Sequence, residues 1–319
     1  MPYNNVIARG DTNEVPDDLS TEIIQNATDQ SAVMSLFRRA NVSKRQNRFP
    51  VLAALPTAYW VNGDTGLKQT TQMAWANKML NVEELAAIVP VPENVIDDAD
   101  FDVWGEVRPR LEEAIGRALD EAVLAGVNAP AAFPTNVRAA AIAAGNAVEA
   151  GATAAEGGAF GDMDDLIGVL EDDGYDPTGY AFTRGMKGRL RRSRTTQGER
   201  NDRDRVDAKF TEFDGDPVTY VGAGIFPEQD TGVKGLLAIA AQWDKYVLGV
   251  RKDITMKVLD QAVIQDNTGA IIYNLPQQDM VALRVTFRAG WEFANPIRQG
   301  QTNTAEMYPA AVLETPAGV

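Results

Sequence analysis

The sequence predicts an α+β fold, because one long helical pattern and several strand patterns are mixed without a regular alternation of strand and helix. Within 101–125, apolar residues recur at spacings of three and four, which is typical of a helix with one buried face. Within 281–287, valine, leucine and phenylalanine alternate with alanine, arginine and threonine, which predicts a strand with one buried side. The 319 residues leave room for about two domains, and 45% hydrophobic residues supply their cores.

The N-terminal residues 1–30 are polar and acidic. Five of their carboxylates lie close together in the sequence, at Asp11, Glu14, Asp17, Asp18 and Glu22. Such a composition predicts an extended arm that becomes ordered only when it contacts another surface. The stretch 32–40 then predicts a short amphipathic helix, with Val33, Leu36 and Phe37 on one side.

The stretch 58–80 predicts a long hairpin, with the sequence AYWVNGDTGLKQTTQMAWANKML. Its centre, NGDTG at 62–66, consists of residues that favour turns. The flanking arms carry four large apolar side chains, at Tyr59, Trp60, Met73 and Trp75. Because an isolated two-stranded hairpin is marginally stable in water, these arms need a further surface to pack against.

Elements after the hairpin follow from local patterns. Residues 84–92 predict a short buried strand that two prolines break, and Pro109 predicts a bend inside the helix that Gly126 ends. Residues 139–155 hold ten alanines and predict a small-residue helix followed by a glycine-rich loop. Further helices are expected at 162–172 and 185–192, and strands at 180–183, 218–221, 235–241, 245–250 and 254–258.

Composition excludes several classes of function. The chain has no cysteine and no histidine, so disulfides, the usual zinc sites, Ser-His-Asp triads and histidine general bases are absent. The net charge is −15 and the pI is near 4.5, which disfavours sequence-specific DNA binding but suits a wall that surrounds DNA without trapping it. The N-terminus has no signal peptide pattern, so the protein is expected to be made in the cytoplasm.

Two charged stretches are candidate sites. The first holds the carboxylates Asp162, Asp164, Asp165, Glu171, Asp172, Asp173 and Asp176. Their spacing does not match a calcium loop, and a solvated helix face is the favoured interpretation, so no metal site is predicted. The second, 184–205, holds nine basic and three acidic residues. It lacks interleaved aromatics, and salt bridges to a neighbouring copy are favoured over phosphate contacts. The candidates for these salt bridges are Arg189, Arg191, Arg192 and Arg194.

An enzymatic alternative rests on tryptophans and carboxylates. Trp60 or Trp75 could stack a sugar in a carboxylate-dependent glycoside hydrolase, which needs two acids across a cleft. The available acids are Asp97, Asp98, Asp100 and Asp244, and their sequence positions do not define a pair. No phosphate-binding glycine motif is present, and no catalytic, cofactor-binding or metal-binding residue is predicted.

The order of several segments resembles a known family. These segments are SAVMSLFRRA, AYWV at the opening of the hairpin, LAAIVPVPENVIDD, VRPRLEEAIGRALDEAVLAG, AQWDKYVLGVRKDITMKVL and DMVALRVTFRAGWEFANP. Each is weak alone, but the ordered set spans nearly the whole chain. It is similar to the major capsid proteins of tailed bacteriophages, whose shell fold is shared with encapsulins.

The resemblance implies a division of the chain into four parts. These are an N-terminal arm at 1–35, an extended hairpin loop at 50–92, a peripheral domain at 93–160 and 251–319, and an axial domain at 161–250. The peripheral domain would contain a spine helix at 101–125 and a long sheet. The matching begins by about residue 31, so the cleavable scaffolding segment that many members carry before the arm is expected to be absent. This implies either a separate scaffolding protein, which is the favoured expectation, or prior processing.

The resemblance also implies a structural, non-enzymatic function without a cofactor. The chain would form pentamers and hexamers of an icosahedral shell around double-stranded DNA, with a portal and decoration proteins as further partners. Its place would be the virion capsid, after assembly in the host cytoplasm. The nearest alternative is the shell of an encapsulin-type nanocompartment. Some relatives cross-link a lysine of the loop to a neighbour, but no partner is identified for a lysine here. The expected contact residues of the hairpin are Tyr59, Trp60, Asp64, Lys68, Met73, Trp75 and Lys78.

Overall fold

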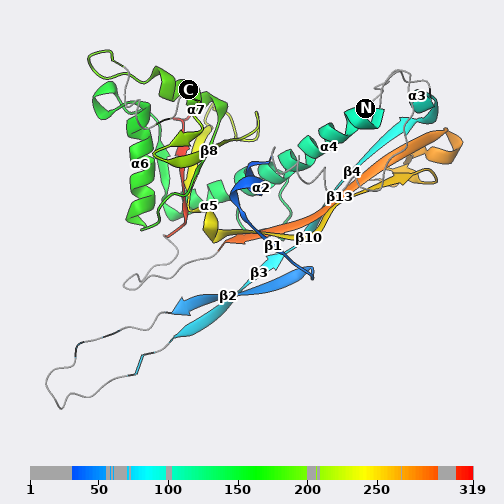
Figure 1. Ribbon diagram of the computed structural model, residues 1–319, viewed down its shortest axis with the longest axis horizontal. Helices are drawn as coiled ribbons and strands as arrows, with labels where there is room; N and C mark the ends of the chain where they lie inside the picture. The colour runs from blue at the N-terminus through cyan, green and yellow to red at the C-terminus, as the bar shows by residue number, and fades with distance from the viewer. Residues whose placement is uncertain are drawn as a thin grey trace.

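Two sheets and a projecting hairpin organise the protein in the computed structural model (Figure 1). The structure describes residues 31–54, 58, 60, 70–71, 73–97, 103–199, 206, 209–266, 268–293 and 307–318. The predicted arm at 1–30 lies outside these residues. Helices and strands are mixed without regular alternation along the chain, and the predicted α+β class is confirmed.

The long sheet has four strands in the order β1-β10-β13-β4. Their bounds are Arg38–Asn41 for β1, Glu83–Pro92 for β4, Tyr246–Leu259 for β10 and Met280–Phe293 for β13. Strand β1 is parallel to β10, and the other two pairings are antiparallel. The predicted break in β4 is wrong, because the strand runs through both prolines. Among the described strands it lies at the edge of the sheet, where proline is tolerated.

One long helix covers a face of this sheet (Figure 1). Helix α4, Val103–Asp120, continues as a π-helical turn, η1, at Glu121–Ala125. Gly126 ends it with a left-handed φ of 77°, as predicted. Pro109 lies inside α4. The apolar side chains at spacings of four, Val107, Leu111, Ile115 and Leu119, are buried in the core shared with the sheet.

The second sheet has six strands in the order β5-β14-β9-β6-β8-β7. The bounds are β5 Ala147–Glu149, β6 Tyr180–Phe182, β7 Glu212–Phe213, β8 Asp216–Tyr220, β9 Leu236–Ala241 and β14 Ala310–Glu314. Its helices are α5 Val137–Ala144, α6 Ala159–Asp172 and α7 Arg184–Arg192, with the short 3-10 turn η2 at Ala154–Glu156. The helix expected within 139–155 is therefore present as α5. The following stretch holds a strand, β5, where a loop was expected.

The sheets group the chain differently from the predicted domain ranges. Strand β14 pairs with β5 and β9 in the six-stranded sheet, whereas 251–319 was predicted to lie with the long sheet. Strand β10 begins at Tyr246, inside the range predicted for the axial domain. All five residues of β14 are buried, and α5 and α6 contact them. A short apolar strand of this kind indicates burial but not the strand with which it pairs.

Smaller elements complete the described chain. They are α2 Ala32–Leu36, α3 Glu93–Asp97, η4 Trp243–Lys245, β11 Val263–Gln265, β12 Ile271–Asn274 and η5 Leu275–Gln277. Strands β11 and β12 pair only with each other among the described strands, and they form a ribbon at the end of β10 and β13. None of the helices within the described ranges is long and apolar enough to cross a membrane.

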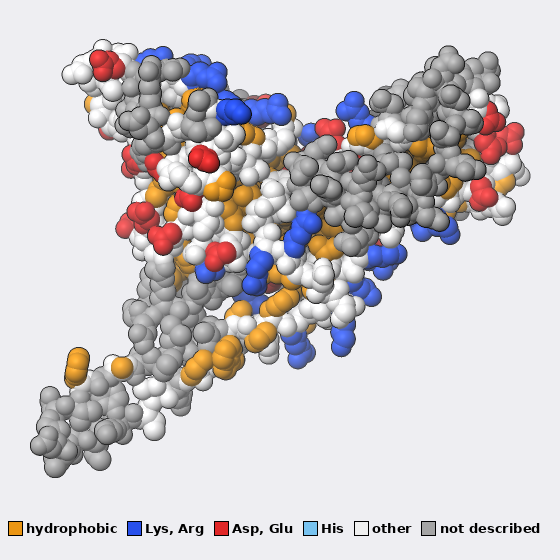
Figure 2. Space-filling model, viewed as in Figure 1, with side chains coloured by type: hydrophobic (Ala, Val, Ile, Leu, Met, Phe, Trp, Pro, Cys, Tyr) orange, Lys and Arg blue, Asp and Glu red, His pale blue; other side chains and the backbone are white. Residues whose placement is uncertain are grey.

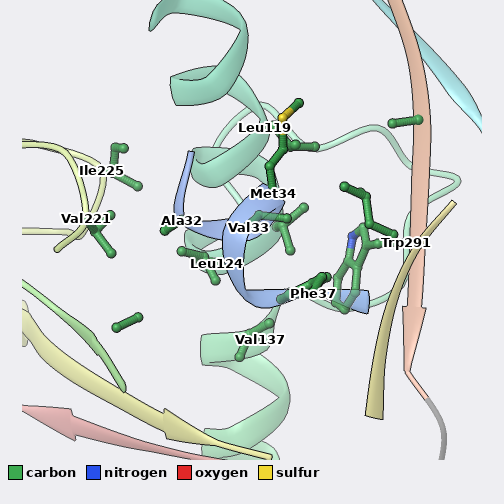
Figure 3. Close-up of a cluster of buried hydrophobic side chains, with 14 of the residues drawn as sticks. Ala32, Val33, Met34, Phe37, Leu119, Leu124, Val137, Val221, Ile225 and Trp291 are labelled. Carbon is green, nitrogen blue, oxygen red and sulfur yellow. The ribbon is translucent and has the colours of Figure 1, made fainter. Parts of the chain in front are cut away.

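The short helix α2 fixes the start of the described chain to α4. Ala32, Val33 and Phe37 are buried near Leu119, Leu124 and Trp291 (Figure 3). The carboxylate of Asp120, the last residue of α4, accepts hydrogen bonds from the first turn of α2. Its donors are Ser31 Oγ at 2.7 Å, Ala32 N at 2.9 Å and Val33 N at 3.0 Å. These bonds satisfy donors that a helix N-terminus otherwise leaves open.

Burial is the main influence on this carboxylate. Asp120 is 1% exposed, and burial raises its pKa to about 6 even though the three hydrogen bonds oppose the shift. The native environment therefore disfavours the charged form of the carboxyl relative to the unfolded chain.

We expect Asp120→Ala to free the first turn of α2. The variant leaves the amides of Ala32 and Val33 buried without their acceptor, which costs about 2 kcal/mol. Hydrogen–deuterium exchange should accelerate across residues 31–37. Asp165→Ala, at an exposed position of α6, is the matched control and should leave that exchange unchanged. Equal exchange in Asp120→Ala and the wild type would contradict the anchoring role.

The same carboxylate predicts a pH dependence. Because its pKa is raised to about 6, the folded protein holds this proton more tightly than the unfolded chain does. The contribution of Asp120 to the free energy of unfolding is therefore largest near pH 4 and falls by about 3 kcal/mol as the pH rises through 6. Urea denaturation followed by tryptophan fluorescence should show a larger loss for Asp120→Ala at pH 4 than at pH 7. A loss that is larger at pH 7 would contradict the sign.

Candidate assembly interface

The hairpin consists of β2, Gln46–Ala54, and β3, Ala74–Asn81. The two strands are antiparallel, with Gln46 opposite Asn81 and Leu52 opposite Trp75. They project away from both sheets (Figure 1). The predicted hairpin is therefore present. Its paired strands, Gln46–Ala54 and Ala74–Asn81, include residues closer to the two sheets than the predicted range 58–80 does. The expected turn at 62–66 lies outside the described residues.

Large apolar side chains of the hairpin are exposed. Trp60 is 98% exposed, Trp75 64%, Met73 51% and Met79 38%. Figure 2 shows hydrophobic side chains along this projection, beyond the bulk of the protein. Such a concentration of exposed apolar area marks a contact surface, and tryptophan buries much area with few rotamers to restrict. Three further predicted contact residues, Tyr59, Asp64 and Lys68, lie outside the described residues.

The base of the hairpin is buried in its own subunit. Leu80 is fully buried and packs with Val42 and Val82, and Phe49 covers this small cluster. The amide of Val82 donates to the carbonyl of Arg45 at 2.8 Å. The hairpin is thus anchored at one end, while its exposed apolar side chains lie toward the other.

Two glycines allow this base to cross the long sheet. Gly249 of β10 and Gly290 of β13 lie directly opposite each other in the strand register. A Cβ at Gly290 would overlap the carbonyl of Asn81, and one at Gly249 would lie 2.8 Å from Leu80 Cδ2. Nδ2 of Asn81 also donates to the carbonyl of Ala132 at 3.0 Å. The end of β3 therefore rests on a part of the sheet where only glycine fits.

Lys78 holds the hairpin to its own subunit. Its Nζ lies 3.4 Å from Oε1 of Glu292 and 3.7 Å from the centre of the Phe293 ring. An ammonium between a carboxylate and an aromatic face is favourably placed. The sequence predicted Lys78 as a contact to a neighbour, whereas the described contacts of its side chain are within the chain.

The predicted basic candidates gather in and after α7. Arg191, Arg192 and Arg194 are exposed, and Arg189 is half-buried. Arg194 donates to the carbonyls of Arg191 and Ser193, both at 2.9 Å. Within the described part of the chain, none of these four arginines forms an ion pair. The guanidinium of Arg191 lies over the ring of Phe210, 5.4 Å from its centre.

A second exposed apolar group was not predicted from the sequence. In the ribbon of β11 and β12, Val263 is 49% exposed, Ile271 62% and Ile272 45%. The ribbon follows the end of β10 at Leu259 and precedes β13 at Met280, so it lies at the opposite end of the long sheet from Gly249 and Gly290. The sequence of residues 263–274 is too short and irregular to predict that these apolar side chains are exposed.

The acidic candidates do not form a site. Asp162 is buried and accepts hydrogen bonds from the amides of Gly151 and Ala152, at 2.9 and 2.8 Å, so it supports a loop. Among the described residues, no group of carboxylates could hold a metal ion. Asp97 follows β4 at one end of the long sheet, whereas Asp244 precedes β10 at the other, so these two do not form a catalytic pair. Asp98 and Asp100 lie outside the described residues.

A long sheet backed by one helix, a compact second sheet and an anchored hairpin with exposed tryptophans define a subunit of a protein shell. The chain belongs to the phage capsid family, whose model matches residues 12–297. The match begins earlier than residue 31, where the resemblance was expected to start, and so includes most of the acidic arm.

Individual relatives agree with this assignment. The chain is 26% identical to the major capsid protein of Staphylococcus phage 80alpha over 281 residues, which are 87% of this chain and 81% of that protein. A solved structure from Microbacterium phage Oxtober96 is 34% identical with a TM-score of 0.78, covering 97% of this chain and 96% of that one. A structure from Mycobacterium phage Adephagia is 30% identical with a TM-score of 0.78, and 91% of each chain is covered.

The family establishes the general function. The chain is a structural major capsid protein, it assembles with copies of itself, and its place is the capsid of the virion. The predicted shell fold is confirmed by these solved structures. The comparisons favour neither the encapsulin alternative nor the glycoside hydrolase.

We expect Gly290→Ala to displace the hairpin base, because the new Cβ would overlap the carbonyl of Asn81. Hydrogen–deuterium exchange should accelerate across 74–82, and the yield of assembled particles should fall. Gly168→Ala in α6 is the control, since nothing lies within 4 Å of its added Cβ. Exchange across 74–82 that matches the wild type would show that the crossing tolerates a side chain.

Proposed function

We propose that this chain forms the pentamers and hexamers of an icosahedral shell around double-stranded DNA, and that each hairpin lies across a neighbouring subunit. The exposure of Trp60 and Trp75, 98% and 64%, carries the proposal. Their own subunit holds the hairpin at its base but leaves these side chains in solvent. Contact with an identical neighbour would bury them, and symmetry would repeat that contact around each ring.

The exposed ribbon of β11 and β12 supplies a second contact. It lies at the opposite end of the long sheet from the hairpin base, so neighbours would hold each subunit at two ends. The basic side chains of and after α7 would add salt bridges to a third surface, with Arg189, Arg191, Arg192 and Arg194 facing carboxylates of the next copy. Charged contacts of this kind set orientation more than affinity.

The shell needs no chemistry from this chain. A net charge of −15 keeps the wall from holding the DNA packed against it, and catalytic or cofactor-binding roles are not proposed for any residue. Assembly would take place in the host cytoplasm. A separate scaffolding protein, a portal at one vertex and decoration proteins on the outside are the further partners of the proposed shell.

The double variant Trp60→Ala, Trp75→Ala tests the hairpin contact. We expect a folded subunit with unchanged far-ultraviolet circular dichroism, because both side chains are exposed, and at least a tenfold loss of particles, since about 2 kcal/mol is removed from each repeated contact. Size-exclusion chromatography and electron microscopy measure the particles.

Ile142→Ala is the control for this variant, because Ile142 is 43% exposed on α5, away from the hairpin. It should assemble normally. If the double variant unfolded the isolated subunit, the tryptophans would belong to an internal core. A compact wild-type monomer that hydrolyses glycosides would support the enzymatic alternative instead.

A further inference from the structure

Four basic side chains line the solvent face of the long sheet. In β13, the buried residues Leu283, Val285 and Phe287 pack toward α4, and the residues between them point the other way. Those that point away include Arg284 and Arg288. Opposite them on β10 are Lys257 and Lys252, and we call these four residues the basic row. Figure 2 shows lysine and arginine side chains along this side of the sheet.

The register of the basic row places like charges together. Lys257 lies directly opposite Arg284, and Lys252 lies directly opposite Arg288. Like charges at directly opposed positions destabilise a sheet. Between the two pairs, the hydroxyls of Thr255 and Thr286 are 2.8 Å apart and hydrogen-bonded. This hydrogen bond holds the two strands together between the charged pairs, although the register shifts on both sides of Lys252.

Within the described part of the chain, one carboxylate forms an ion pair with the basic row. Glu84 of β4 accepts from Nε of Arg288 at 2.6 Å. Lys252, Lys257 and Arg284 are exposed and form no ion pair with a described residue. In a protein of net charge −15, positive charges that no described carboxylate neutralises indicate an acidic partner.

We propose that the basic row binds the acidic arm segment, residues 11–22, of a second copy of this chain. The proposal rests on the proposed shell, in which copies lie side by side. Residues 1–30 contain six acidic residues and one arginine, a net side-chain charge of −5. Glu14 and Asp18 are four residues apart, as are Arg284 and Arg288. In extended chains both pairs span roughly 13 Å.

The position of Ser31 favours a second copy over the chain's own arm. Ser31 is buried and donates to Asp120 at the end of α4. The chain therefore enters the described structure on the face of the long sheet that α4 covers. The basic row lies on the opposite face, and an arm of the same chain would have to pass around the sheet to reach it. An arm of a neighbour needs no such path.

A charge exchange tests the pairing. Lys257→Glu with Arg284→Glu should lower the yield of particles about tenfold, by replacing attraction with repulsion at each repeated contact. Adding Glu14→Lys and Asp18→Lys to the same chain should restore the yield to within about twofold of the wild type. The control is Arg110→Glu with Lys245→Glu, which changes the net charge equally at an exposed and a half-buried position outside the row.

The outcomes separate the competing explanations. Restoration by the arm substitutions supports the proposal. Loss without restoration overturns it, and loss that occurs only when DNA is packaged would assign the basic row to phosphate instead. An unchanged yield in the row variant also overturns it. Because wild-type particles are the reference throughout, failure of this inference leaves the proposed shell intact, whereas failure of the wild type to assemble would refute the shell itself.

Cysteine cross-linking identifies which copy supplies the arm. The chain has no native cysteine, so Asp17→Cys with Lys257→Cys introduces the two thiols alone. Oxidation of assembled particles should give ladders of covalently linked chains on a non-reducing gel. Each single variant is the control and should give no ladder. A cross-linked monomer without a ladder would show that the arm binds its own subunit, and no cross-link would show that the arm lies elsewhere. Either result overturns the proposal.

Discussion

The contact between the hairpin base and the paired glycines of the long sheet governs the rest of this structure. Gly290 lets the backbone at Asn81 lie directly on β13, and Gly249 of β10 leaves room for the side chain of Leu80, which is fully buried there. The strands beyond this point leave the subunit and carry their tryptophans into solvent. The described part of the subunit therefore leaves these apolar side chains exposed, and the proposed contact with a neighbouring copy would cover them.

Local periodicity accounts for what the sequence predicts well. Helix α4 and the alternating strand within β13 each bury one face, and that pattern is visible without knowing any partner. The pairing of distant segments is not visible in this way. Strand β14 is apolar along its whole length, and nothing in Ala310–Glu314 specifies that β5 and β9 lie beside it. The prolines of β4 predict a break for the same reason. The strand is in fact continuous, because it lies at the edge of the described sheet, where a proline without an N–H donor is tolerated.

The exposure of the hairpin aromatics was predictable from the sequence, but the contacts at the hairpin base were not. Aromatic residues around a turn-rich stretch predict an exposed hairpin, and Trp60 and Trp75 are exposed. The ion pair of Lys78 with Glu292 was not predictable, because it joins residues far apart in sequence. Gly249 and Gly290 carried a usable signal, since an isolated glycine in a strand pattern indicates a close approach of another backbone. The like-charged pairs of the long sheet depended on the strand register, which the sequence alone does not specify.

The glycine crossing has a mechanical consequence for a closed shell of uniform subunits. Rings of five and of six copies require different angles between neighbours, although every copy has the same sequence. At Gly290 the hairpin rests on bare backbone with no side chain of the sheet between them, and the long side chain of Lys78 links the hairpin to Glu292 nearby. Since Ala74 is seven residues from Asn81, about 23 Å along the strand, a tilt of about 10° moves that end by about 4 Å. A small rotation at the hairpin base thus gives a large displacement at the far end of β3, and one polypeptide would fit rings of different curvature.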